Sequence, residues 1–361
     1  MTKPLPHLSN VLHVILDWDG TLTKNDTLNS LVEIAKNAKP DTFIPTTWNL
    51  ICRAYLTDYE KALQEHATLP SNVFEERKLL KKIEAVEQAS INRLNDSGIF
   101  KDITAEQLAV GAQRAFESRT VELREGANEF FRYIKERMDR QKDDIDIVSI
   151  LSVNWSQRFI AGCLQAASSA LEPQTPTRES MLEDEIDRRY GLTRNSELQN
   201  ILTNKAPKYM AESSAPDFVR IYANELQGIE DGLPSTGFIA SEGDHKIICS
   251  HDKVTYLHRL QKMSPCTMKP IPIVYVGDSW TDFECLLAAD LGICIRDDPM
   301  TSSQRRLEDS LQRLGIACPY LKEYKEIDEW GIVWAHDFFE IKEWVEIIES
   351  KAVAMASSTE K

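Results

Sequence analysis

The 361-residue sequence has no apolar run close to the roughly 20 residues that a membrane-spanning helix requires, so we expect no membrane partner. Its seven cysteines form no Cys-x-x-Cys pair and no Cys/His metal spacing, and their number is odd. This usage disfavours a disulfide framework and favours reduced thiols. Residues 1–10 contain no apolar segment typical of a signal peptide. We therefore expect a soluble cytoplasmic protein.

The sequence also lacks an excess of positive charge. Its 42 lysines and arginines stand against 57 aspartates and glutamates, a formal net charge of −15. Such a surface repels phosphate backbones, so no nucleic-acid partner is expected. A small anionic substrate is still compatible with this charge, because a local site can be positive within a negative protein. The oligomeric state is not predicted by these features.

Short apolar runs rich in β-branched residues alternate with amphipathic helical segments. We expect strands at residues 11–16, 145–151, 218–222, 271–276, 291–295 and 332–335. Helical spacing is present at residues 128–138, 157–167, 253–262 and 282–289. Strands that alternate with helices predict an α/β fold, with a Rossmann-like parallel sheet and helices on both faces.

Three segments depart from this alternation. Residues 27–118 have only helical patterning, including a capping box at Thr104 and Gln107, and we expect a self-contained helical cap there. Residues 168–216 are polar and predict an insertion within the core, and residues 352–361 predict a flexible tail. The α/β core is accordingly assigned to residues 1–26 and 119–351. The aromatic side chains of Trp48, Tyr55 and Tyr59 share one helical face and are expected in the cap interior.

Polar residues follow three of the expected strands. Asp17 and Asp19 follow the first, Ser152 follows the second, and Asp278 and Asp282 follow the fourth. In a parallel sheet these carboxyl ends lie at one edge, where ligands bind. Phosphoryl transfer needs a nucleophile, an acid, a cation and groups that hold phosphate. The carboxylates supply the first two and suit Mg²⁺, and the Ser152 hydroxyl suits a phosphate oxygen. Lys253, at the start of a helix, can neutralise the aspartates and the transferred group.

The run Asp17–Thr21 (DWDGT) resembles the first motif of the haloacid dehalogenase-like (HAD) hydrolase superfamily. Ser152, Lys253 and the run Gly277–Asp282 are similar to its second, third and fourth motifs, in the same order. The resemblance covers about two-thirds of the chain.

This resemblance implies a role for each motif residue. Asp17 would be the nucleophile and Asp19 the general acid and base, while Ser152 and Lys253 would bind phosphate. Asn154, at a variable position of the second motif, is expected to contact the phosphate as well. Mg²⁺ would be held by Asp17, the Asp19 backbone carbonyl and Asp278, with Asp282 supporting the metal or the lysine. The helical segment at 27–118 lies where the superfamily places a C1 cap, which closes over the site and selects the substrate.

Other interpretations of these residues remain. An Asp-x-Asp-Gly-Thr run alone can be a polar turn that closes a strand. Dehalogenases of the superfamily lack the second aspartate, so Asp19 favours attack on phosphorus. A phosphonatase, a phosphomutase or a degenerate binding protein with the same fold are the alternatives to a phosphatase.

The substrate is predicted only as a small phosphorylated metabolite. Residues 277–293 are similar to the corresponding stretch of plant thiamin monophosphate phosphatases, which implies thiamin monophosphate or a related ester. Phosphoserine phosphatase-like and phosphocholine phosphatase-like enzymes share the cap layout but usually have glycine where Ser279 stands. No residue in the cap sequence indicates which substrate is preferred.

Overall fold

The computed structural model describes residues 3–4, 11–65, 68–141, 145–171, 218–240, 246–263, 271–323 and 329–359. Its centre is a six-stranded sheet in which every neighbouring pair of strands is parallel. Across the sheet the strands are β10 (Ile332–Ala335), β8 (Leu291–Ile295), β7 (Ile273–Gly277), β2 (His13–Leu16), β3 (Ile147–Leu151) and β4 (Val219–Tyr222). Each predicted strand is present, and the predicted parallel α/β sheet is confirmed.

The strand order places β2 in the middle of the sheet. From β2 the chain adds β3 and β4 on one side, and it then returns to add β7, β8 and β10 on the other. The order reverses between β2 and β7, which is the position where open α/β sheets bind ligands. Leu16 is in register with Ile150 of β3 and with Val276 of β7. The residues that follow these three strands therefore begin at the same edge.

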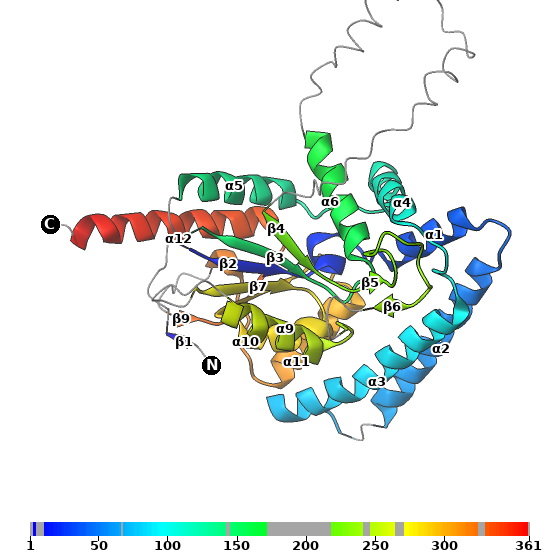
Figure 1. Cartoon of the computed structure of the whole chain (residues 1–361). Helices are drawn as coiled ribbons and strands as arrows, with labels where there is room; N and C mark the ends of the chain where they lie inside the picture. The colour runs from blue at the N-terminus through cyan, green and yellow to red at the C-terminus, as the bar shows by residue number, and fades with distance from the viewer. Residues whose placement is uncertain are drawn as a thin grey trace, which may run out of the picture.

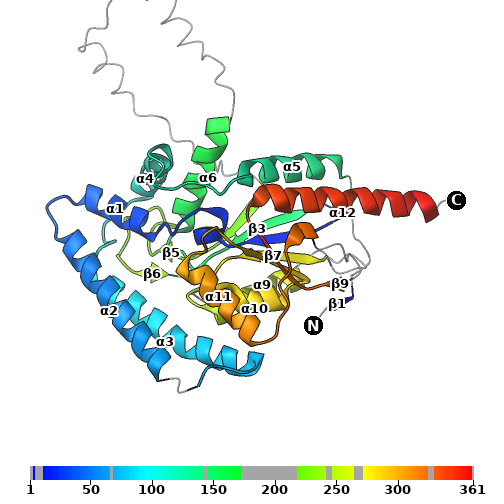
Figure 2. The same cartoon turned by 180° about the vertical axis from the view of Figure 1, so that it is seen from behind.

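Alternating side chains of the strands pack on opposite faces of the sheet. Val14 and Leu16 belong to one buried cluster, and Ile15 belongs to the other. The first face is covered by α5 (Ala127–Arg140), α6 (Gln157–Leu171) and α12 (Phe338–Thr359). The opposite face is covered by α9 (Ser250–Met263), α10 (Phe283–Ala288) and α11 (Ser302–Arg313). Figures 1 and 2 show these two helical layers with the sheet between them.

Four helices occupy the range predicted as the cap. They are α1 (Leu28–Ala38), α2 (Ile44–Gln64), α3 (Val73–Ser97) and α4 (Ala105–Glu117). Asn72 caps the start of α3 by accepting a hydrogen bond from the Glu75 N–H, and the capping box of Thr104 and Gln107 begins α4. Residues 27–65 and 68–118 contribute no strand to the central sheet.

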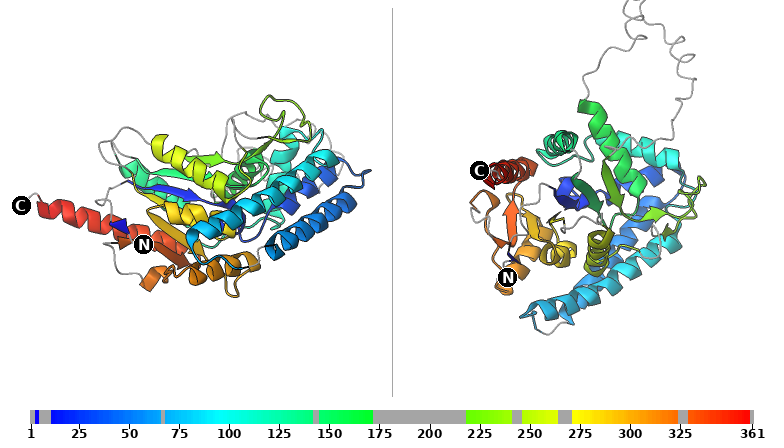
Figure 3. Two further views of the ribbon diagram at one scale, coloured as in Figure 1. Left: turned by 90° about the horizontal axis from the view of Figure 1, so that it is seen from below. Right: turned by 60° about the vertical axis from the view of Figure 1, so that its left-hand side comes forward.

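The cap helices share part of their buried surface with the core. Leu108 and Ala112 of α4 pack in one cluster with Cys163 of α6. Leu79 and Leu80 of α3 pack in the other cluster with α9, α10 and α11 (Figure 3). The apolar stripe of α3 is wide enough to contact α2 and the core together, which the sequence pattern alone does not distinguish. The boundaries of the cap at residues 27 and 118 stay predictions.

Short elements complete the described chain. The strands β5 (Glu225–Leu226) and β6 (Ile239–Ala240) form an antiparallel pair, as do β1 (Lys3–Pro4) and β9 (Glu329–Trp330). Most of the predicted insertion at residues 168–216 lies outside the described residues, although α6 continues to Leu171. The described part of the predicted flexible tail is helical, since α12 continues to Thr359, and its flexibility stays a prediction. Ala352, Ala354 and Ala356 have high helix propensity and extend that helix.

Candidate active site

The turn after β2 brings Asp17 and Asp19 to the edge of the sheet. The Asp17 N–H donates to the Val276 carbonyl oxygen at 2.9 Å, so the strand pairing continues up to this residue. Gly20 then adopts φ of +73°, a left-handed conformation that favours glycine. A Cβ atom at Gly20 would lie 2.6 Å from Asp278 Oδ2. The glycine therefore allows the turn to approach the carboxylate that follows β7.

Arg124 holds the same turn from the other side. Its Nε donates to the Thr21 carbonyl oxygen at 2.9 Å, and its Nη2 donates to the Gly20 carbonyl oxygen at 2.7 Å. Its Nη1 pairs with Asp297, which follows β8. The side chain of Arg124 is buried. Sequence reasoning did not identify Arg124 or Asp297, because no motif spacing connects them to the turn.

Lys253 joins two of the predicted carboxylates. Its Nζ lies 2.7 Å from Asp17 Oδ1 and 2.8 Å from Asp282 Oδ1, and the side chain is fully buried at the start of α9. Asp282 Oδ1 also accepts a hydrogen bond of 2.7 Å from the Tyr275 hydroxyl. Its second oxygen accepts from the N–H groups of Asp278 and Ser279. Lys253 is therefore a fixed cation between the residue after β2 and the residues after β7.

Asp17, Asp278 and Asp282 form a buried carboxylate group. One oxygen from each lies within 4.8 Å of the others, a spacing that a single metal ion can bridge. Thr21 Oγ1 donates to Asp278 Oδ1 at 3.1 Å and so links this group to the first turn. The Asp19 carboxylate lies outside the group. The side chains that can hold a cation are therefore three of the four predicted aspartates, and a contribution from Asp19 rests on its backbone carbonyl.

Lys253 offsets the negative charges of the three carboxylates in this group unequally. Burial, together with the Asp282 carboxylate, raises the pKa of Asp17, although Lys253 opposes the shift. Burial and Asp282 likewise raise the pKa of Asp278 to about 8. Burial opposes ionisation of Asp282 too, but its contacts with Lys253 and Tyr275 keep its pKa below the ordinary value. Lys253 neutralises Asp282 more completely than the other two.

Asp19 is oriented by residues beyond the first motif. Its Oδ1 accepts from the Thr27 N–H at 2.7 Å and from the Thr27 hydroxyl at 2.6 Å. Its Oδ2 accepts from Asn154 Nδ2 at 2.9 Å. Burial raises the pKa of Asp19, and these hydrogen bonds from Thr27 and Asn154 oppose the shift. Asn154, predicted to contact phosphate, thus contacts the second aspartate, and Thr27 was missed because it lies outside every motif.

The turn after β3 carries Ser152 and Asn154 and is fixed by residues after β4. The Ser152 hydroxyl oxygen accepts from the Asn154 N–H at 3.1 Å, and both side chains are buried. Asn224 Nδ2 donates to the carbonyl oxygens of Val153 and Asn154 at 3.2 and 3.1 Å. Glu225 accepts from the Ser156 hydroxyl at 2.8 Å at the start of α6. These contacts fix the turn and hold Asn154 beside Asp19.

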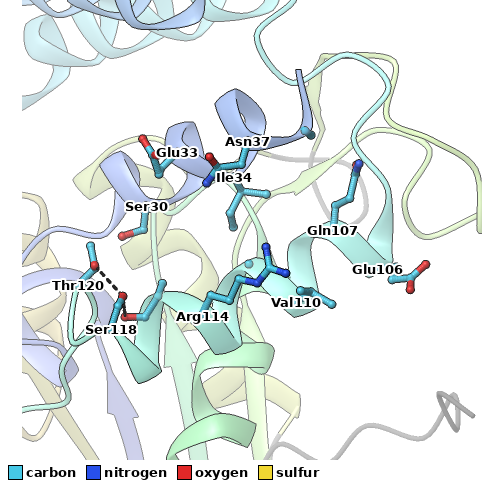
Figure 4. Close-up of a pocket in the computed structure, with 13 residues that line it drawn as sticks. Ser30, Glu33, Ile34, Asn37, Glu106, Gln107, Val110, Arg114, Ser118 and Thr120 are labelled. Atoms are coloured by element: carbon cyan, nitrogen blue, oxygen red, sulfur yellow. Dashed lines mark hydrogen bonds between the residues drawn. The ribbon is translucent and has the colours of Figure 1, made fainter. Parts of the chain in front are cut away.

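A separate cavity of about 490 Å³ lies between α1 and α4 (Figure 4). Its lining includes Ile34, Arg114 and Gln107, and none of the predicted site residues lines it. The Gly111 backbone lies against Ile34 here, since a Cβ at Gly111 would lie 2.3 Å from Ile34 Cγ1. The cavity belongs to the packing of α1 on α4 rather than to the carboxylate group.

Comparison with known proteins adds the following similarities. No protein-family model matches the chain. The chain is 25% identical over 288 residues to a CTO1 family protein of Schizosaccharomyces pombe, which covers 79% of this chain and 81% of that protein. No described helix is both long enough and apolar enough to cross a membrane.

Several solved structures are also similar to the chain. One is a phospho-aspartyl intermediate analogue of phosphoserine phosphatase, with 15% identity, TM-score 0.42, and coverage of 93% of this chain and 99% of that one. Another is a protein of unknown function from Bordetella pertussis, with 12% identity, TM-score 0.43, and coverage of 90% and 99%. A HAD family hydrolase from Salmonella enterica serovar Typhi has 15% identity, TM-score 0.40, and coverage of 84% and 68%.

Proposed function

We propose that this chain is a phosphatase of the HAD-like hydrolase superfamily that hydrolyses a small phosphomonoester through an aspartyl-phosphate on Asp17. The observation that carries the proposal is the position of Lys253 Nζ, 2.7 Å from Asp17 and 2.8 Å from Asp282. A carboxylate nucleophile, a fixed cation and a second carboxylate pair thereby come from three distant segments to the point where the strand order reverses. These three segments carry the first, third and fourth of the sequence motifs.

The reaction assigned to these residues has two steps. In the first, an Asp17 carboxylate oxygen attacks phosphorus, the ester P–O bond breaks, and the leaving oxygen takes a proton from Asp19. In the second, Asp19 takes a proton from water, the water oxygen attacks phosphorus, and the bond to Asp17 breaks to release phosphate. Lys253 and the Ser152 hydroxyl hold the oxygens of the transferred group through both steps.

The carboxylate group fits Mg²⁺. Its donors are hard oxygen atoms of Asp17, Asp278 and Asp282, gathered within 4.8 Å, and Lys253 balances them only in part. Asp17 and Asp278 would hold the ion together with the Asp19 carbonyl, and Asp282 would support it. When bound, Mg²⁺ would screen the charge of the phosphate.

The substrate within this class is a further part of the proposal. The similarity at residues 277–293 makes thiamin monophosphate a candidate, beside phosphoserine and phosphocholine. A phosphomutase uses the same two aspartates and is the alternative reaction, and a degenerate binding protein is the alternative class. Comparison of kcat/KM for thiamin monophosphate, phosphoserine, phosphocholine and sugar phosphates separates the candidates.

The test of the general proposal is hydrolysis of p-nitrophenyl phosphate by the purified chain with Mg²⁺. We expect turnover that EDTA removes and Mg²⁺ restores, with Ca²⁺ a poor substitute because its shell is larger and looser. Asp17→Asn should lose several orders of magnitude in kcat while the variant unfolds cooperatively. Activity that survives EDTA would contradict the metal site, and substantial activity in Asp17→Asn would contradict the nucleophile.

A further inference from the structure

One face of α2 is turned towards the core along its length. Trp48, Cys52, Tyr55 and Tyr59 lie at helical spacing on that face and are all partly exposed. Of the three aromatic side chains expected in the cap interior, Trp48 and Tyr59 pack against the buried clusters. At one end the Trp48 ring contacts Trp155, just after the Ser152 turn, with ring centroids 5.8 Å apart. At the other end the Tyr59 hydroxyl accepts a hydrogen bond from Arg306 of α11 at 2.6 Å. Tyr55 lies between these two contacts.

The neighbouring helix α3 also contacts the core at several points along its length. Glu76 accepts a hydrogen bond of 2.7 Å from Trp280, which lies between Asp278 and Asp282. About two turns after Glu76, Glu84 Oε2 lies 3.4 Å from the Sγ atom of Cys249, which is four residues before Lys253. Farther on, Asn95 accepts from the Ile239 N–H of β6 at 3.0 Å. The contacts of Glu76 and Glu84 place this part of α3 beside the turn after β7 and the start of α9, and Glu87 is one turn beyond Glu84.

Glu87 and Tyr55 meet at the centre of this helix pair. The Tyr55 hydroxyl donates to Glu87 Oε1 at 2.8 Å. Among the described residues Glu87 has no ion-pair partner, and burial raises its pKa to about 7 although the Tyr55 hydrogen bond opposes the shift. The Tyr55 and Tyr59 rings are 5.8 Å apart, and the Arg306 guanidinium lies 4.8 Å from the Tyr59 centroid. One ring of this aromatic pair, Tyr59, is therefore already in contact with a cation, the Arg306 guanidinium.

Building on the proposed phosphatase function, we propose that Tyr55 and Glu87 bind the alcohol part of the phosphomonoester and that this part is an organic cation. A half-buried carboxylate beside aromatic rings attracts a positive ligand through charge and through the ring faces. An anionic alcohol part would be repelled by the Glu87 carboxylate and by the net charge of −15. Cations such as alkylammonium and thiazolium groups have the required chemistry.

The test compares two esters of the same shape. Phosphocholine and 3,3-dimethylbutyl phosphate differ in that a quaternary nitrogen replaces a quaternary carbon, so their ratio of kcat/KM isolates the charge. We expect the natural chain to favour phosphocholine by about tenfold, which corresponds to about 1.4 kcal/mol. Glu87→Gln keeps an acceptor for Tyr55 but removes the charge, and it should reduce the ratio to near one. Glu84→Gln, one turn away on α3, is the matched control and should leave the ratio unchanged.

Hydrolysis of p-nitrophenyl phosphate distinguishes a failure of the cation site from a failure of the phosphatase function. If the natural chain hydrolyses this aryl ester but shows no preference for the cationic ester, the cation site is wrong and the phosphatase function stands. If Glu87→Gln retains the full preference, Glu87 does not bind the cation. If none of the three esters is hydrolysed with Mg²⁺ present, the phosphatase function is wrong and the cation site is wrong with it.

Discussion

Asn154 donates a hydrogen bond of 2.9 Å from its amide to Asp19 Oδ2, and it thereby joins the turn after β3 to the turn after β2. The same amide nitrogen lies 3.1 Å from the Thr27 hydroxyl oxygen, which itself donates to Asp19. Asp19 is thus held by two side chains from different segments. The arrangement favours a role for Asn154 in orienting the acid, in contrast to the predicted contact with phosphate.

The first prediction distinguishes these two roles of Asn154. Asn154→Ala should lower kcat for p-nitrophenyl phosphate by about 10- to 100-fold with little change in KM, because a misplaced acid affects the reaction more than binding. A thermal unfolding curve close to that of the natural chain is the control for folding. A large rise in KM with kcat retained would instead assign Asn154 to the phosphate.

The second prediction concerns the attachment of α3 to the core. Glu76 is fully buried, accepts from Trp280 Nε1, and pairs with Arg313 Nη2 at 2.8 Å. Glu76→Ala leaves both donors without their acceptor, so it should lower the free energy of unfolding by about 2–4 kcal/mol. Chemical denaturation followed by tryptophan fluorescence measures this change.

Its matched control is Glu75→Ala, since Glu75 is the preceding residue on α3 and pairs with Lys78 at the surface. That variant should change stability by less than about 1 kcal/mol. Equal effects of the two variants would show that the buried contacts of Glu76 do not anchor the helix.

The third prediction concerns pH and His13 of β2. His13 is 2% exposed, its Nε2 is 2.9 Å from Ser149 Oγ, and burial together with the charge of Arg220 lowers its pKa to about 4. The unfolded chain binds the proton near pH 6.5, whereas the folded chain does not. The contribution to stability is therefore complete above pH 6.5 and is lost as the pH falls towards 4, by about 3 kcal/mol at most.

Unfolding free energies at several pH values between 7 and 4 measure this loss. His13→Gln has no titrating ring, so its stability should fall less over that range than the stability of the natural chain. The difference between the two curves isolates His13 from the carboxylates, which titrate in both. Parallel curves would show that His13 does not contribute to acid sensitivity.

The sequence by itself determined where the central strands lie and the order in which the candidate site residues follow them. The strands β2, β3 and β7 are short, largely apolar runs that end in a polar turn, and such runs form buried parallel strands because both of their faces can be covered. Asp17, Ser152 and Asp278 follow these runs directly, so their meeting at one edge follows from the parallel topology. The carboxylates were accessible to this reasoning, whereas Lys253 was assigned only by its place in the order of the motifs.

The tertiary structure decided which residues support the site and how the cap helices attach to the core. Arg124 and Asn224 act through hydrogen bonds to turns far away in the chain, and no local periodicity encodes such partners. Thr27 is only eight residues from Asp19, but it lies outside the motif. Glu76 and Trp280 are separated by 204 positions, and before folding Glu76 is indistinguishable from the solvated glutamates beside it. Only the docking of α3 buries that carboxylate, because burial depends on the surface that packs against the helix and not on the helix itself.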